Sequence, residues 1–201
     1  MRSKLRILAI VIILAGMPAF AWYFLEKGTN LRKSAMRALV IKSSIGQFEI
    51  PSEKDYIIRP DSLKGRRWLI AILGDKESRI KNSQQLLNLY KQSKDEFHTN
   101  ILSIIGLENG EAMPLTSQNL KLPSDDKNWL ICYMASDHVY PFCKEAFNLE
   151  SAYQNKPCII LVDENLMIRN YYLFNDEREF KNLVRHYPVF LSLKNKVEDP
   201  K

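Results

Sequence analysis

Glycine and proline are scarce in this chain, and so are the short motifs that mark most enzyme active sites. Only 7 Gly and 9 Pro are spread over 201 residues, so no linker or low-complexity tract is long enough to separate two folded domains. The sequence contains no Gly-rich phosphate loop, nucleophile elbow, HExxH or CxxC motif. Its 46% of apolar and 26% of charged residues are typical of one globular domain with an appendage.

The body of the chain also lacks a strong charge of one sign. The formal net charge is +6, and half of it comes from Arg2, Lys4 and Arg6. A nucleic-acid-binding surface needs a basic stripe interleaved with aromatic residues, whereas the later chain has only short basic clusters at 32–37 and 64–67. We therefore expect no nucleic-acid partner.

The N-terminal segment predicts export or membrane anchoring. No residue from Ile7 to Leu25 is charged, and this run follows a basic start. Its length approaches the ~20 residues that a helix needs to span a bilayer, which favours an uncleaved anchor with a single pass through the cytoplasmic (inner) membrane. The following domain would then lie on the extracytoplasmic, periplasmic side. Because Ala19 and Ala21 have the spacing of a signal-peptide cleavage site, removal after Ala21 is the alternative.

The rest of the chain alternates predicted strands with predicted helices. Continuous apolar runs predict strands buried on both faces, and alternation of polar and apolar residues predicts an edge strand that ends at Pro51. The strands are expected at 46–50, 68–73, 100–106, 129–134, 158–162 and 167–173. The helices are expected at 75–97, at 140–153, and from Asn175 to the residue before Pro188.

This order predicts an α/β fold, a mixed sheet with helices on both faces. A right-handed crossover makes the strands at 68–73 and 100–106 parallel, and the turn at 163–165 favours an antiparallel hairpin. The predicted organisation is a signal anchor, a juxtamembrane stalk, one domain and a polar tail, at 1–25, 26–44, 45–192 and 193–201.

Four segments carry a resemblance to a known family. They are Gly46-Gln-Phe48, Leu63-Lys-Gly65-Arg66, the apolar run that ends Leu73-Gly74, and Lys156-Pro157 with the run up to Asp163. On these residues the body resembles the thioredoxin-like superfamily, and within it most the membrane-tethered Sco/SenC copper chaperones of cytochrome oxidase assembly. The resemblance covers roughly residues 45–191 and implies a thioredoxin-like domain. It also implies a cis-proline at Pro157, with an ordinary trans proline at the start of a strand as the alternative.

The sequence departs from this family where the chemistry is expected. A Sco-like site implies two cysteines four residues apart after the first central strand, and a histidine before the hairpin, because thiolates and imidazole hold copper. The matching positions here are Ser78, Asn82 and the neighbourhood of Asn155. Hydroxyl and amide groups cannot replace thiolates for Cu(I) or exchange disulfides. We predict a degenerate site at Ser78, Asn82, Asn155 and Pro157, with no catalytic residue and no cofactor.

The remaining sulfur and imidazole offer a different site. Cys132, Cys143 and Cys158 are an odd number of cysteines, so at most one disulfide forms and one thiol is left over. A Cys132–Cys158 bridge requires neighbouring strands and Cα atoms within about 7 Å; otherwise both residues behave as small buried hydrophobes. A relocated copper or thiol site would use His138, Cys143 and Cys158.

Together these inferences predict an accessory or respiratory-complex assembly factor without catalytic activity, held at the membrane and acting through protein contacts. A copper-binding or thiol–disulfide protein that uses the relocated site is one alternative. The other is a structural subunit of a membrane complex, with the basic stalk and the aromatic segments Tyr171-Tyr172 and 187–190 as contact surfaces.

Overall fold

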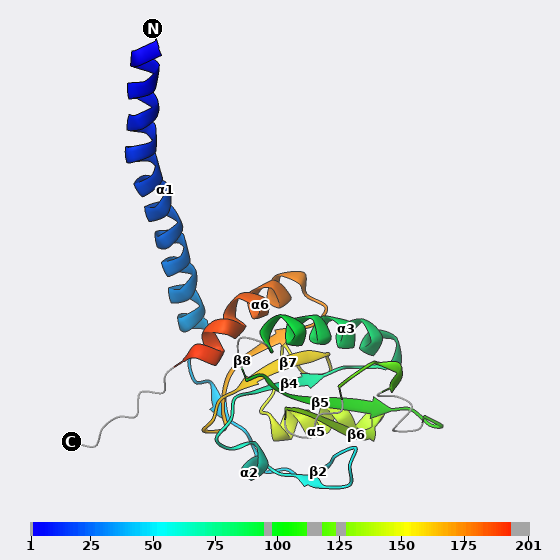
Figure 1. The fold of residues 1–201 in the computed structure, drawn as a ribbon. Helices are drawn as coiled ribbons and strands as arrows, with labels where there is room; N and C mark the ends of the chain where they lie inside the picture. The colour runs from blue at the N-terminus through cyan, green and yellow to red at the C-terminus, as the bar shows by residue number, and fades with distance from the viewer. Residues whose placement is uncertain (1, 95–97, 112–117, 124–127, 194–201) are drawn as a thin grey trace, which may run out of the picture.

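A long N-terminal helix and an α/β body make up the computed structural model (Figure 1). It describes the backbone of residues 2–94, 98–111, 118–123 and 128–193, with side chains from residue 16 onward and those of Ile12 and Leu14. Helix α1 (Arg2–Ala38) is continuous, so the predicted anchor and most of the predicted stalk form one element. Among the residues that the structure describes, no helix is both long and apolar enough to cross a membrane.

A six-stranded mixed sheet forms the centre of the body. Its order is β1 (Ser43–Ser44), β8 (Met167–Leu173), β7 (Cys158–Val162), β4 (Trp68–Ile72), β5 (Asn100–Leu107) and β6 (Trp129–Ala135). Strands β4, β5 and β6 are parallel, while β7 is antiparallel to both β4 and β8, and β8 to β1. The predicted hairpin and the predicted parallel crossover are both confirmed.

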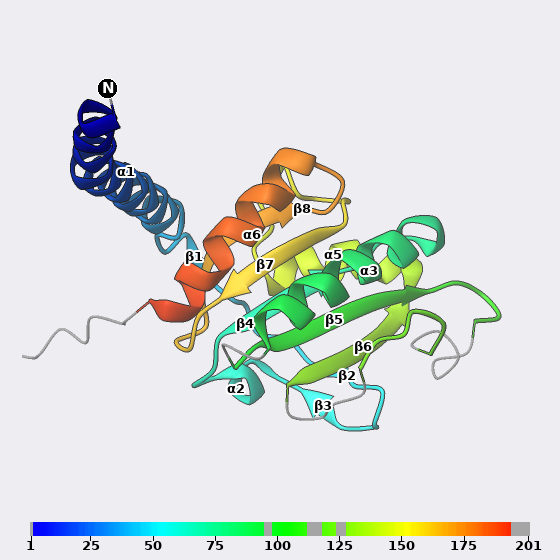
Figure 2. The same cartoon turned by 45° about the horizontal axis from the view of Figure 1, so that its top comes forward.

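Helices cover both faces of this sheet. Helices α3 (Lys76–Ser93) and α6 (Glu177–Ser192) lie on one face, and α5 (Ser136–Ala146) lies on the other (Figure 2). Successive residues of a strand point to opposite faces, so Ile70 and Ile72 pack on the α5 side and Leu69 and Ala71 on the α3/α6 side. Because both faces are buried, β4 is apolar throughout, as the sequence predicts.

Three expected elements differ in the structure. The strand predicted at 46–50 is wrong in extent: only β2 (Ile50–Pro51) pairs, with β3 (Ile57–Ile58), ahead of the short helix α2 (Pro60–Leu63). The backbone N–H of Gly46 instead donates to the carbonyl of Ala146 at the end of α5, at 2.7 Å.

The helix predicted at 140–153 begins and ends earlier. Helix α5 occupies Ser136–Ala146, and Asn148 then adopts a left-handed backbone with φ 45°, a conformation that asparagine tolerates at the end of a helix. Helix α6 continues through Pro188 to Ser192, beyond its predicted end. Helix α3 ends at Ser93, and the predicted extension at 95–97 lies outside the described residues.

Candidate functional site

The junction between β4 and α3 is the position where the resemblance places chemistry. Gly74 has φ +88°, and a Cβ there would lie 2.6 Å from Cγ of Pro157, so this close approach requires glycine. Asp75 caps α3: its Oδ1 accepts the backbone N–H of Ser78 at 2.8 Å and the Ser78 hydroxyl at 2.6 Å. These hydrogen bonds hold the pKa of the Asp75 carboxyl below its usual value. The hydroxyl of Ser78 is therefore engaged in helix capping.

A small cavity of about 200 Å³ adjoins this junction. The starts of α3 and α5 meet there with the loop before β7, and the lining is Gly74, Asp75, Ser78, Ser136, Val139, Tyr140, Asn155, Pro157 and Asn175. The structure thus brings together three of the four predicted site residues. Asn155 has a left-handed backbone with φ 57°, and the peptide bond before Pro157 is trans, so the cis alternative is wrong.

Asn82 lies apart from the cavity lining. It is fully buried, and its Nδ2 donates to the carbonyl of Leu73 at 2.8 Å. Its Oδ1 has no hydrogen-bond partner among the described residues. Asn82 therefore stabilises the end of β4 through this hydrogen bond, and it does not line the cavity.

Tyr140 is a cavity residue that the sequence analysis did not select. Burial, followed by the nearby Asp75 carboxylate, raises the pKa of Tyr140 to about 12, so its phenol stays neutral at physiological pH and can donate a hydrogen bond. The sequence gives no signal for this role, because it places Tyr140 at the start of a helix without indicating which surface that helix end meets. With the neighbouring hydroxyl, amide and carboxylate groups, the cavity is suited to hydrogen bonding with a polar group.

No protein-family model matches this sequence, and no curated protein matches it. Solved structures do. BsSco, a member of the Sco family of cytochrome c oxidase assembly proteins, has a TM-score of 0.57 at 16% identity, over 76% of this chain and 95% of its own. The fold is thioredoxin-like. Copper-bound Sco1 from yeast has a TM-score of 0.55 at 14% identity, over 79% of this chain and 99% of its own. The thioredoxin domain of a thiol-disulfide oxidoreductase from Bacteroides vulgatus has a TM-score of 0.54 at 19% identity, over 76% of this chain and 99% of its own.

The thioredoxin-like domain does not offer the donor atoms that copper needs at this junction. The groups there are the Ser78 hydroxyl, the Asn155 amide and the Asp75 carboxylate. Cu(I) prefers thiolate and thioether ligands, so these residues do not fit that ion. Among the described residues, no group of three or more His, Cys, Asp or Glu side chains is placed to hold a metal ion.

The three cysteines are free and buried. Strands β4 and β5 lie between β6, which carries Cys132, and β7, which carries Cys158. Neighbouring strands are about 4.8 Å apart, so the conceivable Cys132–Cys158 bridge is excluded. Burial raises the pKa of both thiols to about 12, and that of Cys143 well above its usual value.

The relocated site does not assemble around its proposed imidazole. His138 is exposed on the first turn of α5, beside Asp137, whereas Cys143 and Cys158 are fully buried in the core. These two thiols lie close enough for the charge of one to affect the other. Both thiols are held in the protonated state, which is unreactive towards metals and disulfides.

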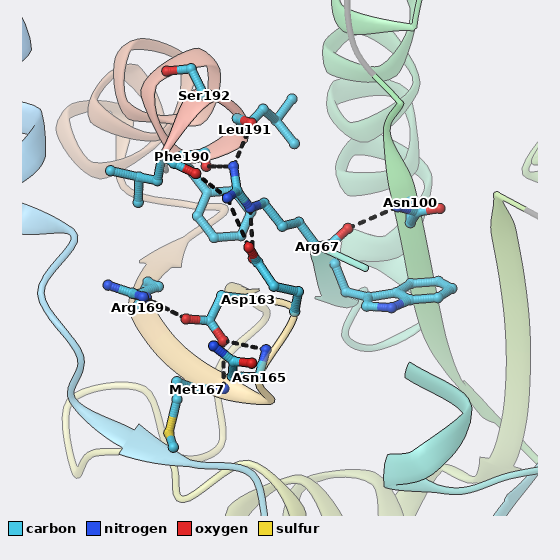
Figure 3. A network of polar contacts seen from close by, with 12 residues as sticks. Arg67, Asn100, Asp163, Asn165, Met167, Arg169, Phe190, Leu191 and Ser192 are labelled. Carbon is cyan, nitrogen blue, oxygen red and sulfur yellow. Dashed lines mark hydrogen bonds and ion pairs between the residues drawn. The ribbon is translucent and has the colours of Figure 1, made fainter. Parts of the chain in front are cut away.

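The polar network around Arg67 and Asp163 lies at the opposite end of β4 (Figure 3). The Arg67 guanidinium donates to both carboxylate oxygens of Glu164 and to the carbonyls of Phe190, Leu191 and Leu193 at the end of α6. Asp163 is 2% exposed and pairs with Arg169 at 2.6 Å. Both groups fix the hairpin and the last helix, so we assign the network a structural role.

Proposed function

We propose that this chain is a membrane-anchored, extracytoplasmic thioredoxin-like protein that acts through protein contacts and carries out no thiol or copper chemistry. We extend to it, as part of this proposal, the role in cytochrome c oxidase assembly that is stated for the family of BsSco. In this role the thioredoxin-like body would recognise a partner protein, and the cavity beside Gly74 would contribute polar contacts to that partner.

One observation carries the proposal. The polar groups that line the cavity at the β4–α3 junction are hydroxyls, a phenol, amides and the Asp75 carboxylate, which already accepts the hydroxyl of Ser78. A redox or copper site needs an accessible ionisable sulfur, and the three cysteines are buried instead. Hydrogen bonding is the chemistry that these residues support.

The anchor is a separate part of the proposal, supported by the sequence and the shape of the chain. Residues 7–25 carry no charge, and they belong to α1, which projects away from the body (Figure 1). Full-length protein in membrane fractions should resist alkaline carbonate extraction. N-terminal sequencing of the mature protein should begin at the first residues of the chain, and a start at Trp22 would show cleavage after Ala21.

Complementation tests the role in assembly. Cells that lack this chain should accumulate less cytochrome c oxidase, measured from haem absorbance. The variant Cys143→Ala/Cys158→Ala should restore the oxidase, whereas Asn175→Trp, which obstructs the exposed rim of the cavity, should not. Asp61→Trp on the exposed side of α2, before the start of β4 and away from the cavity, is the matched control and should restore it. If cells without this chain assemble the oxidase normally, the proposed role is wrong.

The proximity of Cys143 and Cys158 favours a second candidate, a thiol or copper protein with a buried site. The full chain in detergent would then bind Cu(I) or reduce a disulfide, and the double alanine variant would abolish either activity. We expect neither activity, and we expect iodoacetamide to modify the three native thiols only after unfolding in denaturant, because thiols with raised pKa values are poor nucleophiles.

A further inference from the structure

The surface formed by α3, α6 and the lower part of α1 is basic. We call it the basic face; its exposed cationic residues are Lys27, Arg32, Lys33, Arg37, Lys76, Lys81, Lys91, Arg178, Lys181 and Arg185. The exposed carboxylates on these elements and at their N-caps are Glu26, Asp75, Glu77, Asp176 and Glu177. Glu177 is paired with Lys181, and Lys76 with Glu111. The exposed cations of α1, α3 and α6 therefore outnumber the exposed carboxylates on these elements, and the surface carries an excess of positive charge.

The direction in which α1 leaves the body determines which way the basic face points. In Figures 1 and 2, α3 and α6 lie on the side of the body towards which α1 projects. The root of α1 is fixed there, because Ala35 and the following Leu39 are 1% and 2% exposed and α1 packs against α6. If residues 7–25 are in a bilayer, the basic face is turned towards its surface.

The distance between the face and that surface is short. Ten residues of helix separate Leu25, the last of the apolar run, from Ala35, a rise of about 15 Å. The headgroup layer occupies roughly 5–7 Å of that gap, and long Lys and Arg side chains extend from the protein. The remaining separation is comparable to the Debye length of about 8 Å at physiological salt, so charges on the two surfaces interact.

A cavity of about 450 Å³ lies between α1 and α6 on this face. Its apolar lining comes from Leu31, Pro188 and Val189, and its positive charge comes from Arg32 and Arg185. Exposed apolar residues also stand among the cations, with Ile80 on α3 at 56% exposure and Val184 on α6 at 38%. Apolar side chains among Lys and Arg are typical of surfaces that lie in a lipid interface.

We propose that the basic face, including the cavity between α1 and α6, binds anionic phospholipid headgroups and holds the body against the membrane. This inference rests on the proposed anchor. It goes beyond anchoring because it fixes which side of the domain meets the bilayer. The cavity beside Gly74 lies at the end of β4 and the starts of α3 and α5, so this docking leaves the rim at α5 open to a partner.

Energy transfer in nanodiscs tests the proposal with the full chain. A donor dye on Gln84→Cys, on the exposed side of α3, and an acceptor on the lipid headgroups report the distance to the membrane. Glu145→Cys on α5 reports the opposite face. The buried native thiols should remain unlabelled. Changing the lipid from phosphatidylcholine to a mixture with phosphatidylglycerol should increase transfer from position 84 and not from position 145.

Charge reversal provides the matched comparison. Arg178→Glu/Arg185→Glu should abolish the increase, because each basic side chain contributes about fivefold to binding of an anionic surface. Lys64→Glu/Lys144→Glu changes the net charge equally away from the basic face and should leave the increase intact. Salt at about 1 M, where the Debye length is about 3 Å, should also remove it, whereas free glycerol phosphate at low concentration should not.

The outcomes separate this inference from the anchor on which it rests. A chain that does not stay in the nanodisc, or that is extracted by carbonate, refutes the anchor. A chain that stays in the disc and shows equal transfer in neutral and anionic lipid refutes the basic face as a lipid surface, and would point to an acidic protein as its partner.

Discussion

At the scale of single residues, Asp75 determines how the junction between β4 and α3 is used. Its carboxylate caps α3 and accepts both the amide and the hydroxyl of Ser78. Asp75→Ala should lower the free energy of unfolding by about 1 kcal/mol at neutral pH, the usual cost of losing a cap. Asp75→Asn should cost less, because asparagine also caps. Urea unfolding of the full chain in detergent measures both.

The pH dependence of this effect has a definite sign. The pKa of Asp75 is lowered in the folded protein, so its contribution is complete above the unfolded pKa of about 3.9 and is lost as the pH falls through the lower folded value. The advantage of the wild type over Asp75→Asn should therefore decrease below about pH 4. An advantage that grows on acidification would contradict the assignment.

Arg79 is a buried charged residue in the first turn of the same helix, α3. Its guanidinium donates to both oxygens of Glu111 at 2.7 Å and to the carbonyl of Gly106 at 2.6 Å. Arg79→Met should destabilise by about 3 kcal/mol, because the Gly106 carbonyl loses this donor and the Glu111 carboxylate loses its guanidinium partner, keeping the backbone N–H of Glu108. Arg79→Met/Glu111→Gln should be less destabilised than the single variant, and denaturant unfolding would show whether the two changes couple. Strictly additive losses would argue against the ion pair.

At the scale of elements, the end of α6 depends on a side chain distant in sequence. The Arg67 guanidinium binds the carbonyls of Phe190, Leu191 and Leu193 together with Glu164. Arg67→Lys keeps the charge but loses the forked geometry, so we expect a loss of about 2 kcal/mol. Hydrogen exchange should accelerate in the last turn of α6 and not in α3. Lys64→Arg, at an exposed position ahead of β4, should change neither.

This dependence explains which elements the sequence could predict. Strands β4 and β7 are continuous apolar runs and β5 is an apolar run interrupted by Ser103, so their burial is visible in the residues alone. The extension of α6 beyond Pro188 is not visible in the sequence, because its last carbonyls accept hydrogen bonds from Arg67, which lies far away along the chain. Similarly, the end of α5 depends on a left-handed Asn148, for which the sequence contains no periodic signal.

Part of the candidate site could likewise be predicted from the sequence and part could not. Ser78 and Pro157 could be aligned from the residues flanking two strong strands, and the structure places both at one cavity. The separation of Asn82 from that cavity could not be predicted, because it follows from the hydrogen bond to Leu73 that turns the amide inward. The exclusion of the Cys132–Cys158 bridge could not be predicted either, because it depends on the order of the strands in the whole sheet.

At the scale of the whole molecule, one contact controls how the body is held relative to α1. Ala35 is 1% exposed where α1 meets α6, while the next residue, Met36, is 50% exposed. Ala35→Glu would place a charge in that contact, and an unpaired buried charge is costly, so α1 should separate from the body. Met36→Glu adds the same charge on the solvent side and serves as the control.

The two variants should differ in accessibility and in membrane geometry, but not in the fold of the body. Trypsin should cleave Ala35→Glu faster at Arg37 and Lys42, because the contact no longer protects the segment that joins α1 to β1, whereas Met36→Glu should be cleaved at the wild-type rate. Both variants should keep the same urea midpoint for the sheet, since Ala35 packs at the edge of the core. If the body is oriented by the root of α1, Ala35→Glu should also lose the difference in energy transfer between positions 84 and 145 in anionic nanodiscs. Retention of that difference with accelerated cleavage would show that the basic face alone orients the body.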